Sequence, residues 1–161
     1  CIRDRNTTVD TCNKGGIWLQ DRKDVFRRLE RQYFRDQMGA LGLSTVEGML
    51  LRALGRQGRT RQEDLVVQLV LDKGAVARAL GRLEELGLVE RTVSDRCRRE
   101  KLVSPTPEGQ ALAGTIQKVV EEWQEVCFQG FSPEERALFT DFFSRMTENI
   151  MKYKQGEKEH G

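Results

Sequence analysis

The stretch that decides the fold is residues 60–106, which read TRQEDLVVQLVLDKGAVARALGRLEELGLVERTVSDRCRREKLVSPT. Residues 60–63 have the pattern of a capping box and predict a short helix. A turn at residues 70–71 and a cap at Asp72 predict a second helix, whose apolar stripe is Val76, Leu80 and Leu83. Gly87 ends that helix, and two β-prone flanks around a polar loop predict a hairpin over residues 88–104.

The hairpin loop carries the charge excess of the chain. Between Arg91 and Lys101, five basic and two acidic residues give a net charge of +3, whereas the whole chain of 161 residues is only +2. Positive charge gathered in this way indicates contact with nucleic-acid phosphates, which supply most non-specific affinity for DNA. The alternative is a solvated hairpin tip, which is what most exposed charge runs are.

Helices are also predicted on both sides of this stretch. Residues 1–16 lack periodicity and are expected to form a mobile arm. Apolar periodicity predicts a helix over 18–38, and capping signals predict helices that begin after Ser44, Thr106 and Ser132, the last of which ends at Tyr153. The polar tail, residues 154–161, is expected to fray.

Several classes of function find no support in the residues. The cysteines, at positions 1, 12, 97 and 127, and the single histidine, at position 160, lack the spacing of a structural zinc site. No phosphate-binding glycine loop or nucleophile motif is present. We therefore expect no enzyme, no cofactor and no metal. No apolar run approaches the length of a membrane span, so we also expect no membrane contact and a cytoplasmic location.

The terminal helices carry more large apolar side chains than a small helix-turn-helix module can cover. These residues are Phe26, Tyr33, Phe34, Trp123, Phe142, Phe143 and Met146. They can pack against each other within one chain. They can also interlock two copies, and a dimer would hold two DNA-reading elements at fixed spacing.

The chain resembles the MarR family of winged helix-turn-helix repressors over about residues 25–153. The resemblance rests on residues 86–91 (LGLVER), on the arginine-rich loop, and on residues 101–109 (KLVSPTPEG). Two residues depart from the family pattern. Cys97 stands where the wing aspartate is usual, and Pro105 replaces the usual leucine before Thr106.

The resemblance implies a mainly α fold with a small β-hairpin: a winged helix-turn-helix flanked by N- and C-terminal dimerisation helices. The expected divisions are an arm at 1–16, a dimerisation helix at 17–43, a DNA-binding region at 44–104, dimerisation helices at 105–153 and the tail. It also implies an obligate homodimer on a pseudopalindromic operator in double-stranded DNA, released by a small aromatic effector or by cysteine oxidation.

Candidate DNA-binding residues lie on the second helix, whose outward face includes Gly74, Arg78 and Arg82, and in the wing, the hairpin loop. They are Lys73, Gly74, Ala75, Arg78, Arg82, Arg96, Arg98 and Arg99. In the family, positions 74 and 75 usually carry hydroxyl groups, which this chain lacks. The small residues let the helix settle closer to DNA, with Arg78 pairing with guanine. Alternatively, Gly74 and Gly81 only weaken an exposed helix, by about 1 kcal/mol each.

Three residues are candidates for sensing. Arg96 and Arg98 flank Cys97 and favour its thiolate, which would suit a redox sensor, although a neutral substitute for aspartate is the plainer interpretation. Tyr33 and Trp123 are candidates for an effector pocket, although aromatic residues at helical spacing are more often core residues. The leading hypothesis is a DNA-binding regulator that acts as a repressor. The alternative is a winged-helix module for protein–protein contact without operator specificity.

Overall fold

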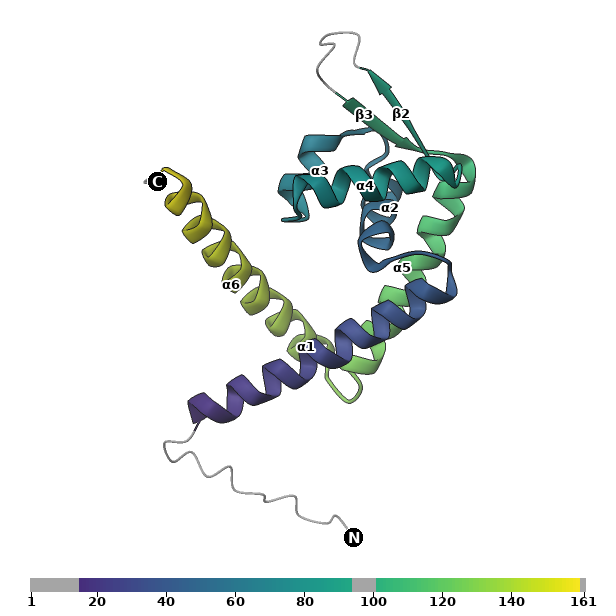
Figure 1. Cartoon of the computed structure of the whole chain (residues 1–161). Coiled ribbons are helices and arrows are strands. Elements are labelled where there is room, and N and C mark those ends of the chain that lie inside the picture. Colours follow the sequence, from purple (N-terminus) through teal and green to yellow (C-terminus); the bar gives the residue numbers. More distant parts are fainter. Residues whose placement is uncertain (1–14, 94–100, 160–161) are drawn as a thin grey trace. The chain divides into compact units, whose positions relative to one another are not determined.

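The computed structural model describes residues 15–93 and 101–159, with side chains for 21–93 and 101–154. The elements are α1 (Gly15–Ala40), α2 (Thr45–Gln57), β1 (Thr60–Arg61), α3 (Gln62–Gln68), α4 (Lys73–Glu85), β2 (Val89–Val93), β3 (Lys101–Pro105), α5 (Pro107–Cys127) and α6 (Pro133–Glu159) (Figure 1). This order confirms the predicted fold class. The chain divides within α5 into two compact units, Cys1–Gln117 and Lys118–Gly161.

The core of the first unit lies among α2, α3, α4 and the small sheet. Its fully buried side chains are Leu50, Leu51, Leu54, Leu65, Leu80, Leu83, Val76, Val89 and Val103. Burial of each such side chain stabilises the fold by roughly 1.5–3 kcal/mol. The predicted stripe of α4 is confirmed, because all three of its residues are fully buried.

The small sheet contains the predicted hairpin and one strand that was not predicted. β2 and β3 are antiparallel, and β1 pairs with the other edge of β3. The capping box predicted at residues 60–63 is therefore wrong. Thr60 pairs with Val103, and its hydroxyl donates to the Gly58 carbonyl at 3.0 Å. Because strand pairing holds this threonine, α3 begins only at Gln62, and Arg61 makes no side-chain cap bond.

Hydrogen bonds at the helix ends explain where the helices begin and stop. The capping box of α2 is confirmed: Ser44 N donates to Glu47 Oε2 at 2.7 Å, and Glu47 N donates to Ser44 Oγ at 3.3 Å. Helices α3 and α4 both end in Schellman motifs, in which two backbone N–H groups beyond the helix bond back to its last turn. Val70 and Gly87 hold the left-handed position of these motifs.

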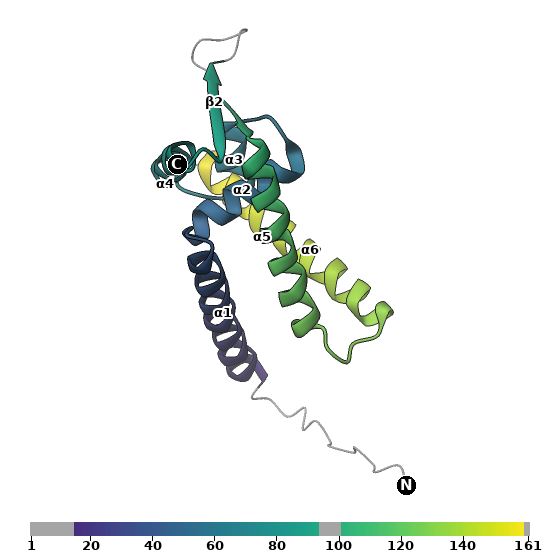
Figure 2. The same cartoon turned by 90° about the vertical axis from the view of Figure 1, so that its right-hand side faces the viewer.

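The first half of α5 packs closely on α2 within the first unit (Figure 2). A side chain at Gly55 would overlap Ala113, so the two helices meet where both residues are small. Gln110 Nε2 donates to the Gly55 carbonyl at 2.9 Å. At the start of α5, a side chain at Gly109 would overlap the Leu88 carbonyl. These contacts fix the first half of α5 against α2 and against the backbone at Leu88.

Both terminal helices extend beyond the predicted limits. α1 begins at Gly15, inside the arm expected at residues 1–16, and ends at Ala40. Gly15 and Gly16 are thus the first two residues of α1, where a glycine destabilises a helix less than it does in the helix interior. α6 continues to Glu159, so the frayed tail expected from residue 154 is wrong. Its last residues are mostly lysine, glutamine and glutamate, which favour helix.

The second unit holds the end of α5 and all of α6. The Arg136 guanidinium bonds to both carboxylate oxygens of Glu125, at 2.9 and 3.1 Å, and lowers the pKa of that carboxyl. The Phe128 ring makes edge contacts with Phe131 and Phe139. α6 nevertheless exposes a large apolar face, formed by Leu138, Phe139, Phe142, Phe143, Met146, Ile150, Met151 and Tyr153.

Candidate nucleic-acid interface

The start of α4 is fixed by the side chain of Asp72. Its carboxylate accepts a hydrogen bond from Ala75 N at 2.8 Å, as the sequence predicts. With the Val76, Leu80 and Leu83 stripe buried, the opposite face of α4 is turned to solvent. On this face Arg78 and Arg82 are exposed and Gly74 is half-buried, with the half-buried Ala75 at its edge. Lys73 is exposed too, but its helical spacing places it on the side of the buried stripe. The structure thus brings Gly74, Arg78 and Arg82 onto one face of α4, with Ala75 beside them, and places Lys73 outside that face.

Arg78 differs from the other cations of α4 in its surroundings. It makes no hydrogen bond or ion pair with any residue that the structure describes. Its Nη1 lies 3.3 Å from the point where a Cβ of Gly74 would stand. The absence of a side chain at position 74 therefore leaves room for the guanidinium to lie across the first turn of α4. The N–H groups of the Arg78 guanidinium are therefore available to a hydrogen-bond acceptor on a binding partner.

Lys73 and Arg82 each have an acidic neighbour. Lys73 Nζ lies 3.3 Å from Glu63 Oε1, and both side chains are largely exposed. Arg82 Nε lies 3.5 Å from Glu47 Oε1, and in this pair the carboxylate side chain is only 7% exposed. The two pairs differ physically, because exposed pairs are screened by water and buried carboxylates are not.

Arg91 belongs to the scaffold of the interface. Its Nε donates to Glu84 Oε2 at 2.8 Å, and its Nη2 also contacts that oxygen, which joins the end of α4 to β2. The hydrogen bonds from Arg91 lower the pKa of the Glu84 carboxyl. Charge counting along the chain assigned Arg91 to the positive excess of the wing and missed this neutralisation. Only the pairing of β2 beside α4 reveals it.

A second basic residue missed by sequence reasoning lies at the base of the wing. Arg59 Nη2 donates to Thr92 Oγ1 on β2 at 3.0 Å, and the Arg59 side chain is exposed. In the sequence, Arg59 stands directly before Thr60. That position indicates a contact with the hairpin only when β1 is known to pair with β3. Arg59 thereby holds β2 from the far side of β3.

The tip of the wing lies outside the described residues. Arg96, Cys97, Arg98 and Arg99 all fall between the end of β2 at Val93 and the start of β3 at Lys101. Their roles in DNA contact and in redox sensing stay predictions.

The effector pocket also stays a prediction. Tyr33 is half-buried in α1, and its ring makes an edge contact with Phe34 at 5.3 Å. Trp123 is half-buried in α5 and belongs to the second unit. Two surface depressions on α1 do not include Tyr33.

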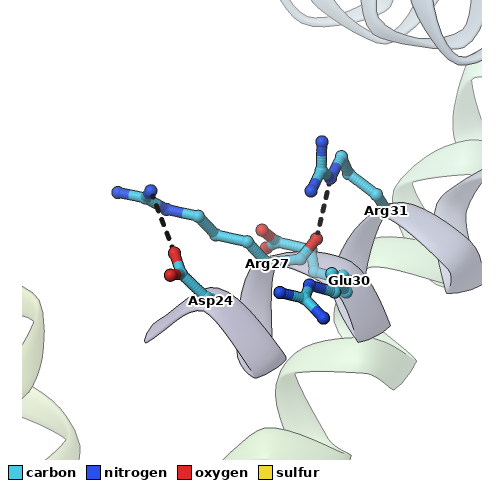
Figure 3. A pocket seen from close by; sticks show the side chains of 5 residues that line it. Asp24, Arg27, Glu30 and Arg31 are labelled. Atoms are coloured by element: carbon cyan, nitrogen blue, oxygen red, sulfur yellow. Dashed lines mark hydrogen bonds and ion pairs between the residues drawn. The ribbon is translucent and has the colours of Figure 1, made fainter. Parts of the chain in front are cut away.

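One of these depressions lies among charged side chains of α1 (Figure 3). Arg27 Nη1 lies 3.7 Å from Asp24 Oδ1, and Arg31 Nε donates to the Arg27 carbonyl at 3.2 Å. The lining residues are Asp24, Arg27, Arg28, Glu30 and Arg31. Because all five come from one helix and carry charges of both signs, the depression has the character of a solvated face.

Among the side chains described, those of residues 21–93 and 101–154, no three from His, Cys, Asp or Glu are grouped so that they could hold a metal ion. Within residues 15–93 and 101–159, no helix has the length and apolar character needed to cross a membrane.

Comparison with known proteins identifies the class to which this arrangement belongs. A helix-turn-helix backed by a small sheet is the fold of winged helix-turn-helix transcriptional regulators. A sequence model of the MarR family matches residues 41–100. Among curated relatives, the uncharacterized HTH-type transcriptional regulator YdgJ of Bacillus subtilis (strain 168) is 32% identical over 109 residues. That match covers 68% of this chain and 66% of the relative, just under two thirds of its length.

Solved structures extend the likeness over most of the chain. A MarR family transcriptional regulator from Silicibacter pomeroyi is 30% identical, with a TM-score of 0.71, over 83% of this chain and 88% of the other. A MarR family regulator from Listeria monocytogenes, complexed with 26mer DNA, is 29% identical, with a TM-score of 0.76, over 83% and 89%. This chain belongs to the MarR family. The family consists of transcriptional regulators, which are not enzymes.

Proposed function

We propose that this protein is a sequence-specific DNA-binding repressor that binds a pseudopalindromic operator as a homodimer. The observation that carries the proposal is the outward face of α4. There Arg78 has no partner among the described residues, while the opposite face of the helix is locked in the core. A rigid helix that presents an unengaged arginine beside small residues suits the major groove, where arginine pairs with guanine.

The wing supplies the second part of the proposed interface. Arg59, Arg91 and the paired strands hold the base of the hairpin against α4. Arg96, Arg98 and Arg99 at its tip then contact minor-groove edges or phosphates. Lys73, Gly74, Ala75 and Arg82 complete the surface on α4.

Binding to DNA is tested by a salt titration. Affinity for a random-sequence duplex and for a duplex selected from a random library by the wild-type protein is measured at several salt concentrations. A regulator gives a linear fall of log affinity with log salt and a clear preference for the selected duplex. Absence of measurable binding at low salt would contradict the proposal and favour a winged-helix module for protein–protein contact.

The proposed dimer is supported by the apolar face of α6 and by Val25, Phe26 and Leu29 on α1. In a single chain these side chains are about half exposed. An apolar surface of this extent is unusual on a soluble monomer and indicates a protein interface. Sedimentation at micromolar concentration is expected to give twice the 18.5 kDa mass of the chain. A monomer would contradict the dimer.

Release from DNA is proposed to follow binding of a small aromatic molecule, for which Tyr33 and Trp123 are separate candidate contacts, or oxidation of Cys97. The two routes are separable. Cys97→Ser abolishes peroxide-dependent release if the thiol is the sensor and leaves ligand-dependent release intact. Release by peroxide in the Cys97→Ser variant would exclude the thiol route through this residue.

A further inference from the structure

Glu47 is the one acidic residue that is buried within the part of the chain whose side chains are described, with only 5% of its surface exposed. It stands in the first turn of α2. One carboxylate oxygen, Oε2, accepts the hydrogen bond from Ser44 N that completes the capping box. The other, Oε1, lies 3.5 Å from Arg82 Nε on α4.

The negative charge of Glu47 needs an explanation beyond the capping box. A glutamine at this position would close the same box, because the box requires only an acceptor oxygen. A carboxylate with little contact to water is costly unless a cation and hydrogen bonds compensate it. Since the cap does not require the charge, the charge is explained by the guanidinium that it faces.

Arg82 forms an ion pair with this carboxylate and still reaches solvent. Its Nε faces Glu47, while 57% of the side chain remains exposed. It lies one helical turn beyond Arg78 on the outward face of α4. A guanidinium held at Nε presents its two terminal nitrogens as a fork, which matches two oxygens of a phosphate.

We propose that Glu47 is a positioning residue that orients Arg82 for contact with a DNA phosphate. The inference rests on the proposed DNA-binding function. A free arginine loses side-chain freedom when it binds, and an arginine that is already held in place does not. Glu47 thus connects the cap of α2, behind the interface, to the affinity of α4 for DNA.

The test is a double-mutant cycle on affinity for a random-sequence duplex. Glu47→Gln keeps the capping bond and releases Arg82, so affinity should fall by about threefold to tenfold. Arg82→Gln should lower affinity and reduce the salt slope by about 0.9. In the Arg82→Gln background, Glu47→Gln should have no further effect, because there is no arginine left to orient.

The matched control is Glu63→Gln. It removes the partner of Lys73, but the Glu63 side chain is 80% exposed, so it cannot hold that cation in place, and affinity should not fall. Thermal melting checks that each variant is folded. Arg82→Gln alone leaves the buried Glu47 carboxylate without its cation and can unfold the protein. Glu47→Gln and the double variant Glu47→Gln/Arg82→Gln both lack that carboxylate. Comparing the salt slopes of these two variants therefore still measures the contact between Arg82 and phosphate.

Three results would overturn the inference. If Glu47→Gln lowers DNA affinity equally in the wild-type protein and in the Arg82→Gln variant, Glu47 acts only on the fold. Equal salt slopes with and without Arg82 in the Glu47→Gln background would show that Arg82 contacts no phosphate. Wild-type protein without salt-dependent DNA binding would overturn the proposed function together with this step, whereas the first two results leave that function standing.

Discussion

Val70 and Gly87 hold the same position in two successive helix-ending motifs. Both have positive φ, 52° for Val70 and 70° for Gly87. In each case the N–H of the next residue bonds back to the helix, Leu71 N to the Val66 carbonyl at 3.2 Å and Leu88 N to the Leu83 carbonyl at 2.9 Å. Glycine adopts this conformation freely, but a β-branched residue is strained in it. The turn between α3 and α4 therefore stores strain that the turn after α4 lacks.

Val70→Gly is expected to stabilise the protein by about 1 kcal/mol. The substitution relieves the cost of a non-glycine residue in the left-handed conformation. Part of that gain is offset, because glycine makes the unfolded chain more flexible. The Val70 side chain is 58% exposed, so its removal forfeits little burial. Urea denaturation measures the change. Gly87→Val is the matched control and should destabilise by about 1–2 kcal/mol or more. A destabilised Val70→Gly variant would show that the valine contributes more by packing than it costs in strain.

Arg78→Ala is expected to weaken binding to the selected duplex by about 1–3 kcal/mol and to relax preference at one base pair in each half-site. The reason is that Arg78 has no partner among the described residues, while Gly74, Ala75, Ala77 and Gly81 near it cannot donate through side chains. Affinities are compared on the selected duplex, on versions changed at each guanine, and on random DNA at one salt concentration. Equal losses on all of them would mean that Arg78 holds only a phosphate.

Arg98→Ala combined with Arg99→Ala is expected to weaken binding to selected and random DNA alike. If both residues neutralise phosphates, the salt slope flattens by about 0.9 for each lost contact. The control is Arg136→Ala, which removes a cation engaged by Glu125 in the second unit and should leave the slope unchanged. Unchanged affinity and slope in the double variant would leave the wing tip as a solvated loop.

Glu84→Gln is expected to change how stability depends on pH. In the folded protein, hydrogen bonds from Arg91 hold the pKa of Glu84 below its ordinary value. A lowered carboxyl pKa stabilises the fold fully above the unfolded-state pKa of about 4.3, and this stability is lost as pH falls through the folded-state pKa. The variant should therefore lose less stability than wild type on acidification below about pH 4.3. Glu85→Gln, one residue along, serves as the control, and identical acid profiles for wild type and Glu84→Gln would contradict the pair.

The sequence by itself determined most of the elements and several of their limits. The residues that begin or end helices act through hydrogen bonds within one turn, so the sequence pattern alone predicts them. They are the pair Ser44 and Glu47, then Asp72, then Gly87. The stripe of α4 follows from helical spacing alone. These local rules, together with the two flanks of the hairpin, were enough to place α4 and its outward residues.

Only the tertiary structure decided which charges on that surface are engaged. Thr60 has the pattern of a cap but pairs with Val103, because a strand partner distant in sequence competes for it. Arg91 counts as a wing cation until β2 lies beside Glu84. Glu47 is a capping residue in sequence and becomes the neighbour of Arg82 only when α2 packs on α4. Each of these partners is set by how the elements pack, and no local pattern in the chain encodes it.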